Sequence, residues 1–419
     1  MGRSQTKRII AAGAIGNILE WYDFAIYGYF AAAIGRTFFP HESPIAQILA
    51  AFGIFAIGFL MRPIGGAVVG YVGDRFGRRA ALTFSVMAMA VPTFLVGALP
   101  GYQVLGVAAP ILLTLLRMIQ GLSVGGEYTT SIVFVVEHAP PGRRGLFGAI
   151  VCAGTTVGIL LGSASGAVLA SMMSPAALEA WGWRIPFLVG LLVGLAGFVL
   201  RRQIQEELKA RTAVVRSPLV ETVRDHRPAV ARLAGFAVFL AVLFYISFVY
   251  IASWLQLADG ISPAHALAIN TISMVVIIPV MCGASWLSDR IGRRPLLLAG
   301  TSIGFVGAVP FFWLMHHDDL LVVLLGQMGL VVAVGMYGGP LAAAMAEAVP
   351  PQVRCTAVAV GYNVPMGLIG GCSPLVATWL VDRTGDDLSP AYMIMAAALV
   401  SFLAALGYKE TYRDKFEIA

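Results

Sequence analysis

Long apolar stretches, interrupted by short polar and basic segments, run along almost the whole chain of 419 residues. A helix needs about 20 apolar residues to cross the hydrocarbon core of a bilayer, and the pattern predicts twelve such helices. They fall at about residues 9–39, 45–72, 80–99, 104–138, 145–173, 184–201, 229–258, 264–288, 295–315, 320–349, 355–381 and 390–408. Transmembrane barrels instead alternate polar and apolar residues, which these segments do not, so the pattern predicts an all-α membrane protein.

Basic residues in the connections indicate how the helices are oriented. If the N-terminus is cytoplasmic, nearly all of the 28 Lys and Arg residues fall in cytoplasmic segments. The exceptions, on the outer side or within spans, are Arg36, Arg62, Arg117, Arg184 and Arg383. The positive-inside rule therefore predicts that both termini are cytoplasmic. The net charge of +6 is then a topology signal, and no nucleic-acid partner is expected.

Composition indicates the same class of protein. The chain is 58% hydrophobic and only 12% charged, with a mean hydropathy of +0.83, whereas soluble domains average about 25% charged residues. We therefore expect a multi-pass protein of the plasma (inner) membrane, with the lipid bilayer as its partner. The first apolar segment is too long for a cleaved signal peptide, so we expect it to remain as a span. The cysteines have no paired spacing and are interpreted as packing thiols, without disulfide or metal: Cys152, Cys282, Cys355 and Cys372.

Two similar halves make up the sequence. "GDRFGRR" follows the second predicted helix and "SDRIGRR" follows the eighth; "EHAPPGRR" follows the fourth and "EAVPPQVR" ends the tenth, at nearly the same offset. A charged segment separates the halves, so we predict an N-terminal six-helix bundle over 1–201, a cytoplasmic linker over 202–228 and a C-terminal bundle over 229–419. Such repeats are typical of transporters, whose substrate site lies between them near the middle of the membrane.

No set of catalytic residues stands out. A Ser–His–Asp combination, a metal-ligand spacing and a nucleotide-binding loop are absent from the sequence, so we expect no enzyme activity, metal or organic cofactor. "HHDD" at His316–Asp319 could suggest a metal, but it falls in a short predicted outer loop, where we expect solvated side chains.

Several of these motifs resemble a known family. "GYVGDRFGRR" and "RMIQG" are similar to motifs of the major facilitator superfamily, and "LEWYDF", "FLMRPIGG", "GLSVGGEY" and "WGWRIPF" resemble its metabolite:proton symporters. That family includes carriers of 2-oxoglutarate, citrate, shikimate, and proline or betaine. "SDRIGRRP" and "SPAYMIM" are most similar to the proline/betaine members. The resemblance implies the twelve-helix major facilitator fold, a small-molecule substrate, a proton as coupling ion and a monomer.

Acids and arginines recur at the cytoplasmic ends of both halves. Carboxylates and guanidinium groups there can form charge-assisted hydrogen bonds in one state of a transporter and lose them in another, which makes a gate. The alternative is that the arginines only set topology, but the repeated acids are not needed for that. The predicted gate consists of Asp74, Arg75, Arg78, Asp289, Arg290 and Arg293, joined by Glu137 with Arg143 or Arg144, and by Glu347 with Arg354.

Ionisable residues also lie deep within the N-terminal spans, where they are costly and usually face a cavity or a partner. Counted along ideal helices, Glu20, Asp23, Arg62 and Glu127 lie at similar depth, with Arg117 slightly further out. We predict that Asp23 and Glu127 carry protons, that Arg117 modulates them, and that Glu20 is more structural. Arg62 and Arg117 can also bind a substrate carboxylate through their planar fork. The alternative is a static charge cluster that only holds helices together.

The C-terminal spans carry polar and aromatic residues but no deep charges, which suggests that they shape the pocket around the rest of the substrate. Tyr250 and Trp254 can pack against a quaternary ammonium, although Trp254 also fits an interfacial aromatic. The predicted substrate-binding residues are Arg62, Arg117, Tyr27, Gln120, Tyr128, Tyr245, Tyr250, Trp254, Gln327, Tyr337 and Asn363. With two arginines against three acids, a monocarboxylate, dicarboxylate or zwitterion fits better than a tricarboxylate.

The fifth predicted helix has a stripe of glycines at every fourth position: Gly154, Gly158, Gly162 and Gly166. A stripe of this kind allows a neighbouring helix to approach closely. The family resemblance implies that this neighbour belongs to the other half.

The sequence thus predicts a proton-coupled symporter that imports a small carboxylated metabolite by alternating access. A proton-coupled antiporter or exporter of a small organic compound is the main alternative. A channel or receptor without coupling is disfavoured by the duplicated halves and the buried acids.

Overall fold

The computed structural model describes residues 18, 20–62, 64–65, 78–123, 127–137, 139–202 and 224–413, and these residues form helices and connecting turns without any strand. The chain divides into two compact units. Unit 1 comprises Met1–Glu127, Gly154–Ala213 and Ser262–Ala268, and unit 2 comprises Tyr128–Ala153, Val214–Ile261 and Ile269–Ala419. The predicted division into bundles over 1–201 and 229–419 remains a prediction, and most of the predicted linker lies outside the described residues.

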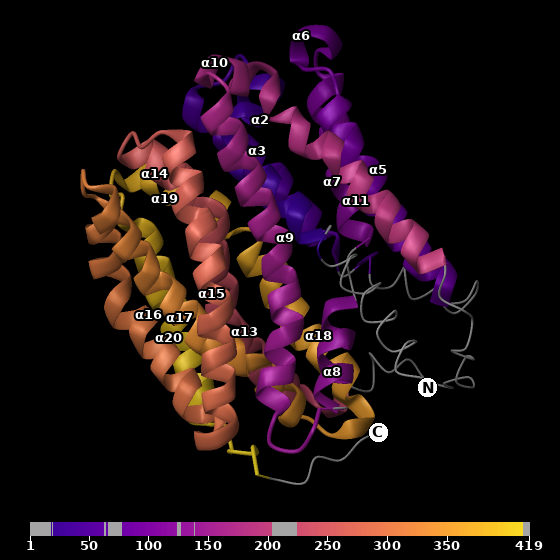
Figure 1. Cartoon of the computed structure of the whole chain (residues 1–419), viewed down its shortest axis with the longest axis vertical. Coiled ribbons are helices and arrows are strands. Elements are labelled where there is room, and N and C mark those ends of the chain that lie inside the picture. The colour runs from indigo at the N-terminus through magenta and orange to yellow at the C-terminus, as the bar shows by residue number, and fades with distance from the viewer. Residues whose placement is uncertain are drawn as a thin grey trace. The chain divides into compact units, whose positions relative to one another are not determined.

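Unit 1 is built mainly from the first helices of the chain. A helix over residues 20–29 is followed by α2 (Ala31–Phe38), α3 (Pro44–Leu60), α5 (Arg78–Ala98), α6 (Tyr102–Leu105), α7 (Ala108–Ser123), α10 (Pro175–Ala177), η1 (Leu178–Gly182) and α11 (Arg184–Arg202). The unit also contains α9 (Arg144–Met172) from Gly154 onward. α5 packs between α7 and α11, and these three helices lie side by side (Figure 1).

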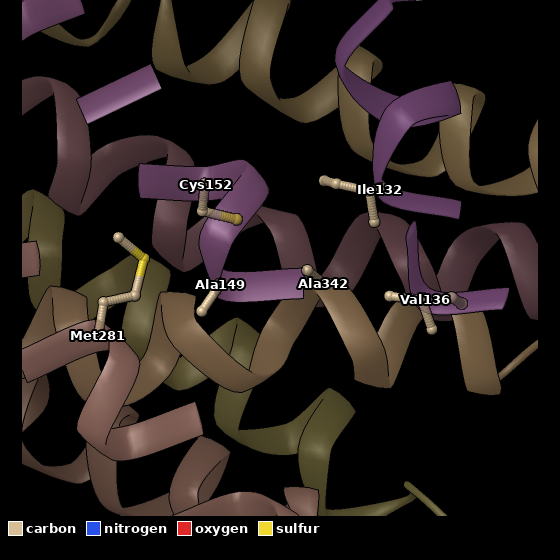
Figure 2. Packing of buried hydrophobic residues seen from close by; sticks show 7 residues of the cluster. Ile132, Val136, Ala149, Cys152, Met281 and Ala342 are labelled. Carbon is tan, nitrogen blue, oxygen red and sulfur yellow. The ribbon is translucent and has the colours of Figure 1, made fainter. Parts of the chain in front are cut away.

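Unit 2 contains α8 (Glu127–Glu137) from Tyr128, the beginning of α9, and most of the remaining helices. These are α13 (Arg227–Tyr245), η2 (Ile246–Tyr250), α14 (Ile251–Ala258), α15 (Pro263–Ile291) from Ile269, α16 (Arg293–Met315), α17 (Leu320–Glu347), η3 (Pro351–Val353), α18 (Arg354–Pro365), η4 (Met366–Gly370), α19 (Ser373–Thr384) and α20 (Ser389–Leu406). α16 packs against both α17 and α20, as Figure 1 shows. A buried apolar cluster joins α8, α9, α15 and α17 through Ile132, Val136, Ala149, Cys152, Met281, Ala342 and Ala346 (Figure 2).

Seven of the described helical segments are long and apolar enough to cross a membrane: Arg144–Met172, Arg227–Ala258, Pro263–Ile291, Arg293–Met315, Leu320–Glu347, Arg354–Thr384 and Ser389–Leu406. Three further apolar helices are shorter, over Pro44–Leu60, Phe84–Ala98 and Ala108–Ser123. Large apolar side chains on these helices are open to the surroundings; Val306 and Trp313 of α16, for example, are 73% and 70% exposed. Side chains of this kind are stable when lipid takes the place of water, as expected for a multi-pass membrane protein.

Local signals explain where several helices begin and end. Ser43 accepts a hydrogen bond from the Ala46 amide at the start of α3, and Pro44 provides a favourable first residue. At the C-terminal end of α5, Arg184 donates hydrogen bonds to the carbonyls of Gly97 and Leu99 at 3.0 and 2.6 Å. The arginine of the "WGWRIPF" motif therefore satisfies carbonyls that the end of the helix leaves without amide partners.

The glycine stripe of α9 faces neighbours from both halves of the sequence. A Cβ at Gly158 would lie 3.0 Å from the Cβ of Trp21, and one at Gly162 would lie 2.9 Å from the Cβ of Ala25. Both glycines thus allow close approach of the helix over 20–29, which belongs to the N-terminal half of the sequence. The expectation of a partner from the other half is wrong at these two positions. It is confirmed at Gly166, where a Cβ would lie 3.1 Å from Cδ1 of Leu267 on α15.

Candidate functional site

A buried charge pair lies at the centre of unit 1. Asp23 is fully buried on the helix over 20–29, and its Oδ2 accepts a hydrogen bond from Arg117 Nη1 of α7. Its Oδ1 accepts from Gln120 Nε2 at 2.7 Å and from Thr93 Oγ1 at 2.8 Å. Three donors from two other helices therefore surround one carboxylate, and the guanidinium balances its charge. A charge buried in a membrane protein needs compensation of this kind.

Arg117 is held firmly but keeps unused donors. Its side chain is 1% exposed, its Nη1 also donates to Gln120 Oε1 at 2.8 Å, and its guanidinium carbon lies 4.2 Å from the centre of the Tyr27 ring. Among the described residues, its Nε and Nη2 have no hydrogen-bond acceptor. A buried guanidinium with two unsatisfied nitrogens can donate hydrogen bonds to a second anion, and a carboxylate matches its planar fork.

Helix packing brings these groups together. A Cβ at Gly58 of α3 would lie 3.2 Å from the carbonyl oxygen of Arg117, so glycine allows α3 to approach α7 closely. Tyr22 donates its hydroxyl to the Pro186 carbonyl at 2.8 Å, which joins the "LEWYDF" helix to α11. Tyr27 donates to the Ala51 carbonyl at 3.1 Å, so its ring is fixed beneath Arg117.

A second pair lies on the same first helix. Glu20 accepts a hydrogen bond from Arg62, and both side chains are buried. The Arg62 guanidinium carbon lies 4.8 Å from the centre of the Phe59 ring and 5.4 Å from that of Phe24. This arrangement agrees with a more structural role for Glu20, and it already gives Arg62 a carboxylate partner.

Other predicted residues of this half are outside the described part of the chain. Asp74 and Arg75 are not described, and the same holds for the side chains of Arg78, where α5 begins, and of Glu127, where α8 begins. The proposed proton-carrying role of Glu127 therefore remains a prediction, as does the first-half portion of the gate.

A charged network occupies one end of unit 2, and it consists of Glu137, Arg144, Asp289, Arg293, Glu347 and Arg354. Arg144 pairs with Glu347 at 2.9 Å, and Arg354 donates to Glu137 at 2.6 Å. The expected pairings, Glu137 with Arg143 or Arg144 and Glu347 with Arg354, are therefore exchanged. The reason is geometric: α8 lies beside α17 at this end, as the apolar cluster of Figure 2 shows, so each acid meets the arginine of the other repeat.

Asp289 and Arg293 complete this network. Both oxygens of Asp289 accept from backbone amides at the start of α9, those of Gly145 and Leu146, at 2.8 and 3.0 Å. Arg293 donates to Asp289 at 2.6 Å and contacts both oxygens of Glu347 at 3.1 and 3.3 Å. Asp289, the repeated acid of "SDRIGRR", therefore caps α9, which begins at the last residue of "EHAPPGRR". Arg290 lies outside the network, with its guanidinium carbon 3.6 Å from the centre of the exposed Trp286 ring.

The C-terminal segment also joins this network, which the sequence did not indicate. Glu410 accepts from the Arg293 and Arg294 amides, both at 2.9 Å, and so caps the start of α16. Thr411 donates to Glu347 at 3.0 Å, and the Tyr412 carbonyl accepts from Arg144 at 3.0 Å. Burial, with Glu347 nearby, raises the pKa of the Tyr408 phenol, which therefore stays protonated within this segment.

The predicted pocket residues of unit 2 occupy several distinct places. Gln327 and Tyr337 of α17 are fully buried; Gln327 donates to the Ser247 carbonyl at 2.7 Å, and Tyr337 donates to the Phe236 carbonyl at 2.6 Å. Trp254 donates to the Asp387 carbonyl at 2.9 Å and packs against His316, near the connections at the far end of the unit. His316 itself pairs with Asp259 at 2.6 Å, so the interpretation of "HHDD" as simply solvated is wrong at its first residue.

The other predicted pocket residues have partners in their own surroundings. Tyr128 lies with its hydroxyl 3.1 Å from the Cys152 sulfur and its ring 5.2 Å from that of Tyr362. Tyr245 is buried directly before the π-helical turn η2, Tyr250 is buried as the last residue of that turn, and Asn363 of α18 is partly buried. None of these placements tests substrate binding, which remains a prediction for each residue.

Comparison with known proteins places the chain among transporters. The profile described as Major Facilitator Superfamily matches residues 13–364. The chain belongs to the major facilitator superfamily. Relatives of this superfamily member include the glycine betaine/proline/ectoine/pipecolic acid transporter OusA of Dickeya dadantii, which is 35% identical over 97% of this chain and 83% of its own length. The proline/betaine transporter of Escherichia coli is 33% identical over 97% of this chain and 84% of its own.

The fold of this major facilitator chain is also found among solved structures. It resembles the D-xylose-proton symporter with a TM-score of 0.76 at 19% sequence identity, over 98% of this chain and 99% of the other. A partially occluded inward-open form of the xylose transporter XylE from E. coli gives a TM-score of 0.72 at 19% identity, over 95% and 97% of the two chains.

Sequence reasoning missed several residues of these sites. Thr93 is a hydroxyl residue that follows Pro92 inside a predicted span, and Ser247 is a lone hydroxyl within an aromatic run; a systematic search for polar residues within spans would have found both. Glu410 lies beyond the last span, where acids are common, so nothing in the sequence marked it as a helix cap.

Proposed function

We propose that this chain is a proton-coupled symporter that imports a small carboxylated metabolite, with a zwitterion such as proline or betaine as the first candidate. The observation that carries the proposal is the pair formed by Asp23 and Arg117, in which a fully buried acid meets a guanidinium with two nitrogens that find no acceptor among the described residues. The printed names of the relatives, which are proline and betaine transporters, support this substrate class.

Coupling follows from competition for Arg117. While Asp23 is ionised it holds the guanidinium, and a substrate carboxylate has to compete with it. When Asp23 takes up a proton, the ion pair is lost and Arg117 needs another anion, because an unpaired charge in a low-dielectric interior is costly. Proton and substrate carboxylate then load together, and they leave together when Asp23 is deprotonated and recaptures Arg117.

The rest of the proposed mechanism concerns the whole chain. We infer twelve transmembrane helices in two six-helix bundles, both termini in the cytoplasm, and a monomer in the inner membrane. The bundles alternate in access, and the charged network of unit 2 acts as the cytoplasmic gate. The buried bidentate contact of Arg293 with Glu347 supports this role, since a multi-point ion pair is a stable latch until the helices carrying it separate. No cofactor besides the proton is required.

The test uses purified protein in liposomes that contain a trapped pH-sensitive dye. Proline, betaine, 2-oxoglutarate, citrate and shikimate are added outside, one at a time. We expect saturable internal acidification with at least one of them, and its loss in Asp23→Asn. Glu179→Gln is a matched control, because Glu179 forms an ion pair in the same unit but is half-exposed.

Different outcomes separate the alternatives. Internal alkalinisation on adding substrate would indicate proton antiport. Substrate flux without any proton movement, in protein shown to be folded, would mean that the Asp23–Arg117 pair is a static structural cluster. Non-saturable flux would indicate a channel.

A further inference from the structure

The turn between α13 and α14 has an unusual pattern of hydrogen bonds. Residues Ile246–Tyr250 form the π-helical turn η2, which departs from the regular ladder of an α-helix. Turns of this kind occur frequently at functional sites. Two side-chain amides from neighbouring helices donate to carbonyls of this turn: Gln327 of α17 to Ser247 at 2.7 Å, and Asn270 of α15 to Phe248 at 3.1 Å.

The bond from Gln327 determines which way its amide points. A carbonyl oxygen can only accept, so the nitrogen Nε2 must face Ser247 O and the oxygen Oε1 must point elsewhere. Gln327 is fully buried, and within the described part of the chain its Oε1 has no hydrogen-bond partner. Turning the amide over would only replace this unsatisfied acceptor by a repulsive contact between two oxygens.

Ser247 likewise has a buried polar atom without a hydrogen-bond partner in the described part of the chain. Its side chain is fully buried, and its hydroxyl has no partner among the described residues. Other buried hydroxyls of unit 2 donate to a carbonyl one turn back in their own helix, such as Ser273 to Ile269 at 2.8 Å and Ser285 to Met281 at 2.8 Å. Ser247 therefore departs from this common solution, and it is the residue whose carbonyl accepts from Gln327.

Within the described part of the chain, these two buried atoms lack partners and are suited to a ligand that donates hydrogen bonds, because a buried polar group without a partner is destabilising. Neither Gln327 nor Ser247 carries a charge, so a charged donor bound here is stable only if its molecule brings its own counter-charge, as a zwitterion does. A secondary ammonium such as that of proline has two N–H donors. The fully methylated nitrogen of a betaine has none.

We propose that Gln327 Oε1 and Ser247 Oγ accept the N–H groups of a secondary-ammonium zwitterion such as proline, and that they distinguish it from fully methylated betaines. This inference rests on the proposed function. It concerns the nitrogen end of the substrate only.

The test compares proline and glycine betaine as competing substrates in the same liposomes. Ser247→Ala removes only the orphaned hydroxyl and leaves the carbonyl that Gln327 uses. We expect it to raise the KM for proline about tenfold, the effect of losing one hydrogen bond to a charged group, while the KM for betaine changes by less than about twofold. Gln327→Met removes both atoms of the amide and should act in the same direction. Ser273→Ala is the matched control, since that buried hydroxyl already has its own partner.

The outcomes also separate this inference from the function on which it rests. If the wild-type protein moves neither compound with protons, the proposed function fails and the inference falls with it. If the wild type moves both but Ser247→Ala and Gln327→Met change both KM values equally, the orphaned atoms hold water or shape the turn, and the inference is wrong. Unchanged kinetics in both variants would overturn it as well.

Discussion

Breaking the Asp23–Arg117 pair gives the most direct measure of the buried cluster. Asp23→Asn keeps the size of the side chain and an oxygen that can accept from Gln120 and Thr93. It removes the negative charge and turns an acceptor facing Arg117 into an N–H donor. The arginine, 1% exposed, is then left without its counter-charge.

The magnitude follows from the burial of both partners. Removing one member of a buried ion pair costs about 3–5 kcal/mol, because the other charge stays in a low-dielectric interior. Here Asp23→Asn should lie near the lower limit, about 3 kcal/mol, since two of the three donors keep an acceptor. Arg117→Gln should cost a similar amount. The double variant removes both charges and should cost little more than either single one, which gives a coupling energy of about 2–3 kcal/mol.

The assay is a double-mutant cycle of unfolding free energies, measured by chemical unfolding in mixed micelles and followed by circular dichroism. Arg36 and Glu179 supply a control cycle, because they form an ion pair at 2.7 Å with both side chains about half exposed, 47% and 46%. That cycle should give a coupling of no more than about 1 kcal/mol. If the two single effects at Asp23 and Arg117 add to within about 0.5 kcal/mol, the two residues are not coupled, and our account of the cluster is refuted.

Four further predictions concern packing and the charged network. Gly158→Val should lower the unfolding free energy by about 1–3 kcal/mol, because even its Cβ would lie 2.5 Å from the Ile18 carbonyl oxygen, closer than van der Waals contact. Gly154→Ala should be neutral or slightly stabilising in the same measurement, since nothing lies within 4 Å of the added Cβ. Glu410→Ala should cost about 1 kcal/mol in thermal unfolding by uncapping α16, and a cost of zero would contradict the capping role. Arg354→Lys should slow or weaken substrate counterflow, because the single nitrogen of lysine does not reproduce the planar fork whose two nitrogens donate to Glu137 and to the Ala346 carbonyl. Unchanged counterflow would argue against this contact as part of a gate.

Much of the candidate site could be anticipated from its chemistry. Asp23 and Arg117 are charged residues inside apolar stretches, and such residues must find partners wherever the helices place them. The exchange of partners between Glu137 and Glu347 could not be anticipated in this way. Sequence repetition suggested pairs within each repeat, whereas the structure pairs Arg144 with Glu347 and Arg354 with Glu137.

Hydropathy and charge placement along the chain established a membrane-embedded helical protein with buried charges, because both act within a single segment and need no knowledge of its neighbours. Only the tertiary structure decided which atoms are satisfied. The unused nitrogens of Arg117, the orphaned oxygen of Gln327 and the cap that Glu410 places on α16 all depend on helices far apart in the chain. Hydrogen bonds are directional and short, so a shift of one turn in any of these helices would pair different atoms.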